Sequence, residues 1–302
     1  MRSLQAPDAF TSSFLESLAL EPKVPLPEQS CLTTEYQPDL KHDEQLNSRY
    51  TLVKKLAKGV YASVWLATDA HYPPGTLREI KVLSYKSTLA QGDLVFDRTV
   101  ARIINNAVMR NPKHPGSQHV QHILHHFVLY LPRSEHLCLV SKALGRSLCQ
   151  LKAQFDHGAL PVSIIRRFTR QLLQALAFLH DECDIVHTGM STVFVNDDIL
   201  IDEYGAERAK ESEIDFVLID FSFASPVRWG RDHCIQPEAY RSPEVLLGLV
   251  FDHEADIWYL GCVVFELLTG TCLFPLYEKR SSQDDVDGPL NVTSPACFRV
   301  SA

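Results

Sequence analysis

Two charged residues in one short segment, Glu79 and Lys81, have the types and spacing to bind each other or to face the same ligand. The segment around them predicts a strand, and side chains two residues apart in a strand point to the same face. The pair could form an ion pair within the strand, or a buried carboxylate could crowd a ligand bound by the lysine.

A group of histidines between the two halves of the chain could suggest a metal site. Spacings of three and four residues align side chains on one face of a helix, where imidazoles can converge on a metal ion. The alternative, which we favour, is a set of surface histidines in a connecting segment. The residues concerned are His114, His119, His122, His125 and His126.

The elements that must position these residues follow from the hydrophobic pattern. Short segments of alternating character predict strands at 50–56, 63–68, 79–84 and 136–140. From Pro161 the apolar residues recur three or four apart, which predicts a long helix whose first turn contains this proline. The prolines before residue 50 predict an extended arm on or near the first lobe. No internal repeat is evident.

Four segments in the second half of the chain resemble protein-kinase motifs, in the same order. Val186–Phe194 has the frame of a catalytic loop, and Ile219–Ser222 stands where kinases have Asp-Phe-Gly. Arg241–Glu244 stands at the Ala-Pro-Glu position, and the apolar stretch from Asp256 to Gly270 resembles the central helix of the C-lobe. This resemblance implies a protein-kinase fold.

Other segments resemble SR-protein kinases and the fungal proteins like them. The first two strands, the His-Thr start of the catalytic loop and the segment before Pro-Glu are similar to theirs, over residues 36–276 or so. These segments are Arg49–Leu56, Ser63–Ala67, His187–Thr188, Ile235–Gln236 and Tyr240–Ser242.

The expected fold is therefore α+β and bilobal, with a small β-rich N-lobe and a mainly helical, C-terminally incomplete C-lobe. We expect an extended N-terminal arm at 1–48, the N-lobe at 49–142, a partial C-lobe at 143–277 and an irregular tail at 278–302. A C-lobe that ends early should expose apolar surface. The short tail is interpreted as a truncation or a faulty gene end.

Composition limits the partners. The 302 residues, 45% of them hydrophobic, can bury a substantial core, and the net charge of −8 with a pI near 5.9 argues against direct binding of nucleic acid. The eight cysteines form no Cys-x-x-Cys pair, which predicts neither a zinc ribbon nor a disulfide framework. The apolar runs are far shorter than the roughly 20 residues that span a membrane, so we expect a soluble intracellular protein. The resemblance implies a cytoplasmic or nuclear location.

The catalytic loop has the frame but lacks the expected chemistry. By resemblance, Gly189 stands at the position of the catalytic Asp, Ser191 at that of the phosphate-binding Lys, and Phe194 at that of the Asn that binds a second magnesium. Phenylalanine has no oxygen with which to bind this cation. His187 keeps the kinase residue type, but the degenerate loop predicts that efficient phosphoryl transfer is lost. Nearby Asn196, Asp197 and Asp198 predict a polar turn, although an irregular loop could bring one of them inward.

The nucleotide side is better preserved. By resemblance, ATP would contact Gly59, Val64, Lys81 and Leu144, and Asp220 would bind Mg²⁺, although a loop-holding role is the alternative for Asp220. Glu79 stands where kinases have a small Ala beneath the adenine. The hinge at Ser141–Leu144 departs from the family, but its contacts to adenine use backbone groups.

An active kinase also pairs the strand lysine with a Glu on the N-lobe helix, and the chain has no Glu between Glu79 and Glu135. Asp93 and Asp97 are the only acidic residues in that interval. Asp97 is the nearer substitute, and its side chain is one methylene shorter.

The resemblance implies a serine/threonine kinase activity of the SR-protein-kinase type, ATP-dependent phosphorylation of basic Arg-Ser-rich proteins, in catalytically impaired form. One alternative is a pseudokinase that binds a protein partner or competes with an active relative, and another is a truncated relative without function. A small-molecule kinase fits the motifs less well.

Overall fold

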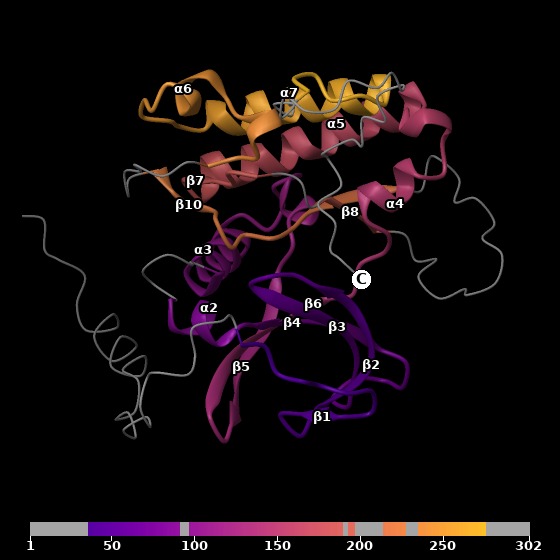
Figure 1. Ribbon diagram of the computed structural model, residues 1–302, viewed down its shortest axis with the longest axis vertical. Helices are drawn as coiled ribbons and strands as arrows, with labels where there is room; N and C mark the ends of the chain where they lie inside the picture. Colours follow the sequence, from indigo (N-terminus) through magenta and orange to yellow (C-terminus); the bar gives the residue numbers. More distant parts are fainter. Residues whose placement is uncertain (1–35, 91–96, 190–192, 197–213, 228–234, 276–302) are drawn as a thin grey trace, which may run out of the picture.

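The computed structural model describes residues 36–90, 97–189, 193–196, 214–227 and 235–275. They form a lobe dominated by one antiparallel sheet and a second lobe built on long helices (Figure 1). The chain crosses between the lobes through residues 143–147, after strand β6 and before helix α4. The predicted α+β, bilobal architecture is thus confirmed.

The sheet of the first lobe has the strand order β1-β2-β3-β4-β6-β5. All neighbouring strands are antiparallel, and the four predicted strands lie within β2, β3, β4 and β6 apart from their end residues. The strands are β1 (Gln45–Leu46), β2 (Tyr50–Lys58), β3 (Ala62–Asp69), β4 (Leu77–Leu83), β5 (Ile123–Leu131) and β6 (Ser134–Lys142).

The two faces of this sheet have different roles. Trp65, Ile80 and Val82 point into the apolar core of the lobe. Because side chains alternate along a strand, Glu79 and Lys81 lie on the opposite face of the sheet. Their side chains contact residues outside the sheet, Leu144 and Asp220 respectively. The end of the arm also packs here, since Leu40 and Leu46 join the same core.

Two helices follow β4, α2 (Tyr85–Leu89) and α3 (Asp97–Arg110). The buried side chains of α3, Val100, Ile104 and Ala107, belong to the large apolar core that also contains the helices of the second lobe. The helix therefore ties the second lobe to the strand lysine, because its first residue, Asp97, lies beside β4.

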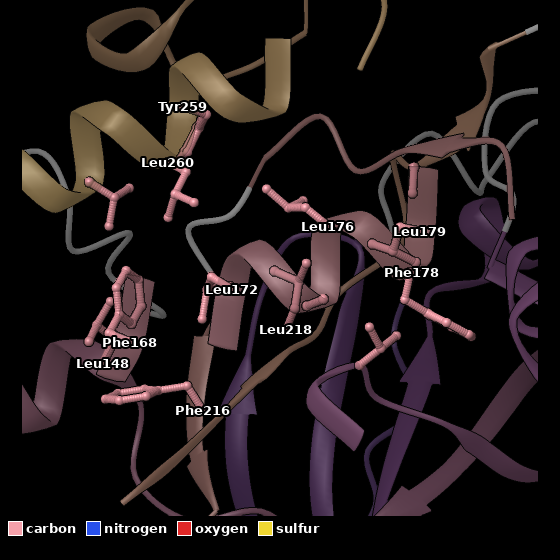
Figure 2. Close-up of a cluster of buried hydrophobic side chains, with 14 of the residues drawn as sticks. Leu148, Phe168, Leu172, Leu176, Phe178, Leu179, Phe216, Leu218, Tyr259 and Leu260 are labelled. Carbon is pink, nitrogen blue, oxygen red and sulfur yellow. The ribbon is translucent and has the colours of Figure 1, made fainter. Parts of the chain in front are cut away.

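The second lobe is built around α5 (Val162–Ala177), which begins directly after Pro161. Its apolar face packs with Tyr259 and Leu260 of α7 (Glu254–Thr269) and with Phe216 of strand β9 (Figure 2). The remaining elements are α4 (Leu148–Lys152), a π-helical turn (Phe178–Glu182), α6 (Pro243–Leu246) and short 3-10 turns at Ser117–His119, Asp156–Gly158 and Glu238–Tyr240.

Two small sheets bring the motif segments together in this lobe. Strand β7 (Ile185–Val186) pairs with β10 (Ser225–Pro226), and β8 (Val193–Asn196) pairs with β9 (Asp215–Leu218). The residues after β7 and those after β9 therefore lie next to each other.

Several large apolar side chains are exposed in this lobe. They include Leu247, Leu249 and Val250 after α6, Ile257 on α7 and Phe274 beyond its end. Among the described helices, none is both long and apolar enough to cross a membrane. Cys138, Cys183, Cys262 and Cys272 are free thiols, whereas Cys149 is disulfide-bonded, which the cysteine spacing did not predict.

Candidate nucleotide site and catalytic loop

The Lys81 ammonium is the centre of a cluster of charges between the lobes. Its Nζ donates to Asp97 Oδ1 at 3.1 Å, to Asp220 Oδ1 at 2.9 Å and to Ser222 Oγ at 2.6 Å. The side chain extends from β4, Asp97 opens α3, and Asp220 follows β9. Three separate elements thus bring the strand lysine, the helix acid and the loop acid together.

Asp97 takes the place expected for the missing helix glutamate. Its side chain is buried, and its Oδ1 also lies 3.4 Å from the Ser222 hydroxyl, while its buried Oδ2 has no hydrogen-bond partner among the described residues. Although its side chain is one methylene shorter than that of glutamate, Asp97 of α3 reaches the Lys81 ammonium. Asp93, the other candidate, lies outside the described residues.

The charges in the cluster stabilise one another. Burial alone would lower the pKa of Lys81, but the carboxylates of Asp220 and Asp97 outweigh burial and raise it. Burial alone would raise the pKa of Asp220, but the Lys81 ammonium outweighs it and lowers this pKa to about 2. The Asp220 side chain is 43% exposed, so one partner of the lysine remains accessible from the solvent.

The backbone at Asp220 has an uncommon left-handed conformation, with φ of 66°. Ser222, two residues later, donates its hydroxyl to Asp220 Oδ1 at 2.8 Å and accepts from Lys81. Sequence reasoning missed this contact and treated residue 222 only as a replaced glycine. The sequence does contain an indication of this contact, because a serine hydroxyl two residues after an aspartate can form a local hydrogen bond with it.

Glu79 does not pair with Lys81, so an ion pair within the strand is wrong. Its Oε1 instead accepts a hydrogen bond of 3.0 Å from the backbone N–H of Leu144, between β6 and α4. The side chain is 5% exposed, and burial raises the pKa of Glu79 to about 7 although the Leu144 hydrogen bond opposes this shift. Glu79, which stands at the position expected beneath the adenine, thus accepts the hydrogen bond from the backbone N–H of Leu144 in the hinge.

The glycine turn between β2 and β3 is held by the arm. Gln37 Nε2 donates to the carbonyl oxygens of Gly59 at 2.6 Å and Val60 at 3.0 Å. A Cβ at Gly59 would lie 3.6 Å from the Ala62 carbonyl oxygen, an ordinary contact, so this turn does not require glycine. Val64, the other candidate here, is half-buried and pairs with Lys81 across the strands.

The catalytic-loop backbone is fixed by one buried carboxylate. Asp256 of α7 accepts from the N–H of His187 at 2.8 Å and of Thr188 at 2.9 Å, and its Oδ2 lies 3.0 Å from His180 Nε2. The His187 ring is buried, and its Nε2 lies 3.0 Å from the Ile219 carbonyl oxygen. The first residues of the loop, His187 and Thr188, are therefore held beside the segment that carries Asp220.

The position expected for the catalytic base has no side chain. A Cβ built at Gly189 would have no neighbour within 4 Å, so no other group of the described chain fills this space closely. Phe194 lies in β8 opposite Val217, in a strand rather than in a metal-binding loop, and Asn196 ends that strand. Ser191, Asp197 and Asp198 lie outside the described residues.

The histidines do not lie on one helix. His119 is in a 3-10 turn and is 3% exposed, with its Nδ1 3.0 Å from the Phe216 carbonyl oxygen, so the expectation of surface histidines is wrong for this residue. His122 contacts the Ser117 carbonyl oxygen, and His125 contacts the Tyr50 hydroxyl. The side chains thus have separate partners.

Comparison with known proteins agrees with this geometry. The family model described as protein kinase domain matches residues 50–295. The chain is 26% identical to a serine/threonine-protein kinase SRPK of Physarum polycephalum, over 84% of this chain and 68% of that protein. It is 33% identical to the serine/threonine-protein kinase AFC3 of Arabidopsis thaliana, over 51% of this chain and 42% of that protein.

Other relatives extend the range of kinase groups. A serine/threonine protein kinase of Aspergillus fumigatus is 26% identical over 78% of this chain, and the match spans 61% of that protein. The dual specificity tyrosine-phosphorylation-regulated kinase 2 of Drosophila melanogaster is 29% identical over 78% of this chain and 29% of its own length. The chain therefore spans about two thirds or less of these relatives. From the family match and the arrangement of the motif segments, the chain belongs to the protein kinase family.

Proposed function

We propose that this chain binds ATP and magnesium between its lobes and is a catalytically impaired kinase of the SR-protein-kinase type. One contrast carries the proposal. Lys81 is held between Asp97 and Asp220. In the catalytic loop, by contrast, Gly189 supplies no side chain at the position of the base. The groups that hold phosphates are assembled, and the group that would orient a substrate hydroxyl is missing.

On the nucleotide side, the phosphates would compete with Asp220 for the Lys81 ammonium. Asp220 would hold a single magnesium together with phosphate oxygens and water, since Mg²⁺ commonly uses one or two carboxylates beside substrate phosphates. The bound metal neutralises charge on the phosphates. The position of the second metal ligand does not fit, because Phe194 has no oxygen in its side chain.

On the catalytic side, His187 and Thr188 are positioned by Asp256, but neither Gly189 nor Ser191 supplies the expected charge. One well-placed transition-state donor is worth about 2.7 to 4 kcal/mol in known enzymes. Such losses do not add within one catalytic unit. The loss of two expected charged groups nevertheless supports impairment.

For the partner, we propose basic Arg-Ser-rich proteins, in the cytoplasm or the nucleus. The net charge of −8 and the similarity to proteins named SRPK support this choice. A pseudokinase that binds such a protein without turnover is the second candidate. The hydrogen bonds that hold the backbone of His187 and Thr188, just before Gly189, favour it, because a binding surface can persist when catalysis is lost.

A thermal-shift titration with ATP and magnesium tests the nucleotide site, because a ligand of the native state raises its stability. We expect stabilisation of the wild-type chain and its loss in Lys81→Met. If ATP does not stabilise the wild-type chain, nucleotide binding is refuted.

Transfer of radiolabelled phosphate to an Arg-Ser peptide tests impairment, with Asp220→Ala as the control. We expect no transfer above the level of the control. Transfer that disappears in Asp220→Ala would show that the chain is an active kinase.

A further inference from the structure

Glu79 faces the nucleotide site and not the solvent. It shares a face of β4 with Lys81, whose ammonium reaches Asp97 and Asp220. The side chain is 5% exposed, and its two neighbours across the strands are Leu66 of β3 and Ser141 of β6. A carboxylate is therefore held in a buried position, two residues along the strand from the lysine of the proposed phosphate site.

The partner of this carboxylate is a backbone donor of the segment that joins the lobes. Leu144 is buried and follows β6, so its N–H has no strand partner in the sheet. The N–H donates to Glu79 Oε1 at 3.0 Å. A buried donor without an acceptor costs free energy. Here Glu79 is the acceptor, so the Leu144 N–H is hydrogen-bonded even when no ligand is bound.

We propose that Glu79 is an internal plug that occupies the hydrogen-bond donor for a purine ring, so that the cleft binds magnesium polyphosphate with little selection for the base. This inference rests on the proposed nucleotide binding. A purine ring nitrogen would have to displace the carboxylate from Leu144, whereas a polyphosphate chain at Lys81 would leave that contact intact.

The plug does not depend on ionisation of the side chain. Burial raises the pKa of Glu79 to about 7, so both protonation states are present near neutral pH. Either state retains a carboxyl oxygen that can accept from the Leu144 N–H. Because an amide oxygen can accept the same hydrogen bond, Glu79→Gln keeps the plug and removes the charge, whereas Glu79→Ala removes both.

The test compares affinities for ATP and for inorganic tripolyphosphate, both with magnesium, by isothermal titration calorimetry. In the wild-type chain we expect the two affinities to agree within about threefold. Glu79→Ala should tighten ATP by about tenfold more than tripolyphosphate, which corresponds to about one hydrogen bond. Glu79→Gln should behave as the wild type. Glu135→Ala, at the far end of β6, is the control for the loss of a carboxylate.

Several outcomes would overturn the plug. A wild-type preference for ATP above about tenfold would show that the base is already read. An equal gain for both ligands in Glu79→Ala, together with the same gain in Glu79→Gln, would assign the effect to charge repulsion instead. If neither ligand binds any variant, the proposed nucleotide binding itself fails, which is a distinct result.

A second measurement does not depend on affinity or on the stability of Glu79→Ala. The backbone amide of Leu144 gives one signal in a nitrogen-proton NMR spectrum. Saturating ATP should leave this signal of the wild-type chain unchanged, while signals near Lys81 move. Movement of the Leu144 signal by ATP beyond that caused by tripolyphosphate would show that the base displaces Glu79, and the proposal would be wrong.

Discussion

The charge cluster around Lys81 and the catalytic loop at His187–Gly189 lie beside each other but differ in what they keep. Around Lys81 the groups proposed to hold the nucleotide contact one another, with Asp97 as a shorter substitute for a glutamate. In the loop the backbone is held by Asp256, and the reacting side chain is missing at Gly189. A fold can therefore preserve the position of a loop separately from its chemistry, because the residues that position it lie outside it.

The largest expected effect comes from removing Asp256, the residue that holds the loop backbone. Asp256 is fully buried and accepts from two backbone N–H groups of the loop. Asp256→Ala leaves these buried donors unpaired, at about 1–3 kcal/mol each, and should lower the free energy of unfolding by about 4 kcal/mol in urea denaturation. Glu254→Gln, exposed on the same helix, is the control and should change it by less than about 0.5 kcal/mol. A small effect of Asp256→Ala would mean that the loop frame is held from elsewhere.

A second test concerns Glu79, which lies on the same strand as Lys81 but outside its charge cluster. The folded pKa of Glu79 is raised from 4.5 to about 7, so the folded chain keeps a proton that the unfolded chain releases. The stability from this proton is complete below pH 4.5 and is lost as the pH rises to about 7. Between pH 5.5 and 8 the wild-type chain should lose about 2 kcal/mol relative to Glu79→Gln.

The measurement is urea denaturation of both proteins across this pH range. Histidines titrate equally in the two proteins, so the difference isolates residue 79. A pH-independent difference would show that Glu79 is ionised throughout and that the buried plug contributes no proton linkage.

A third test asks whether Asp97 really fixes the lysine. Asp97→Asn keeps a hydrogen-bond acceptor but removes the charge beside Lys81, and should cost about 1.5 kcal/mol of stability. In a double-mutant cycle with Lys81→Met, the two losses should couple by about 1 kcal/mol. Additive losses would assign the position of the lysine to Asp220 and Ser222 alone.

The elements and the motif residues could be predicted from the sequence, but the hydrogen-bond partners of the polar side chains could not. The strands and α5 follow from hydrophobic period, and Lys81 and Asp220 follow from motif order. The Glu79 contact could not be predicted, because strand alternation gives the face of a side chain but not its partner 65 residues away. The same limit applies to the Ser222 hydroxyl, which meets Lys81 from a loop 141 residues later.

Asp97 and His119 show two further limits. The contact of Asp97 with Lys81 depends on how α3 packs beside β4, and the sequence pattern does not give this packing. His119 is buried because the turn before β5 packs against β9, a long-range contact that local polarity does not report. The hydrophobic pattern of the sequence therefore predicts the helices and strands, whereas the hydrogen-bond partners of polar groups depend on tertiary packing.

The smallest expected effect is the most informative for the loop. A side chain at Gly189 would meet no atom within 4 Å at its Cβ, so Gly189→Asp should change the free energy of unfolding by less than about 0.5 kcal/mol. Its phosphoryl transfer should remain undetectable, because Ser191 and Phe194 still lack the expected groups and such groups act as a unit. Transfer in the single variant would mean that the base alone had been lost.

The triple variant Gly189→Asp, Ser191→Lys and Phe194→Asn completes the comparison, with radiolabel transfer to an Arg-Ser peptide as the measurement. If the loop lacks only these side chains, restoring them should make transfer appear. Because Glu79 still occupies the Leu144 donor, adding Glu79→Ala should then lower the KM for ATP more than it raises kcat. A gain in kcat alone would instead place the effect of Glu79 on the reacting phosphate, through its charge.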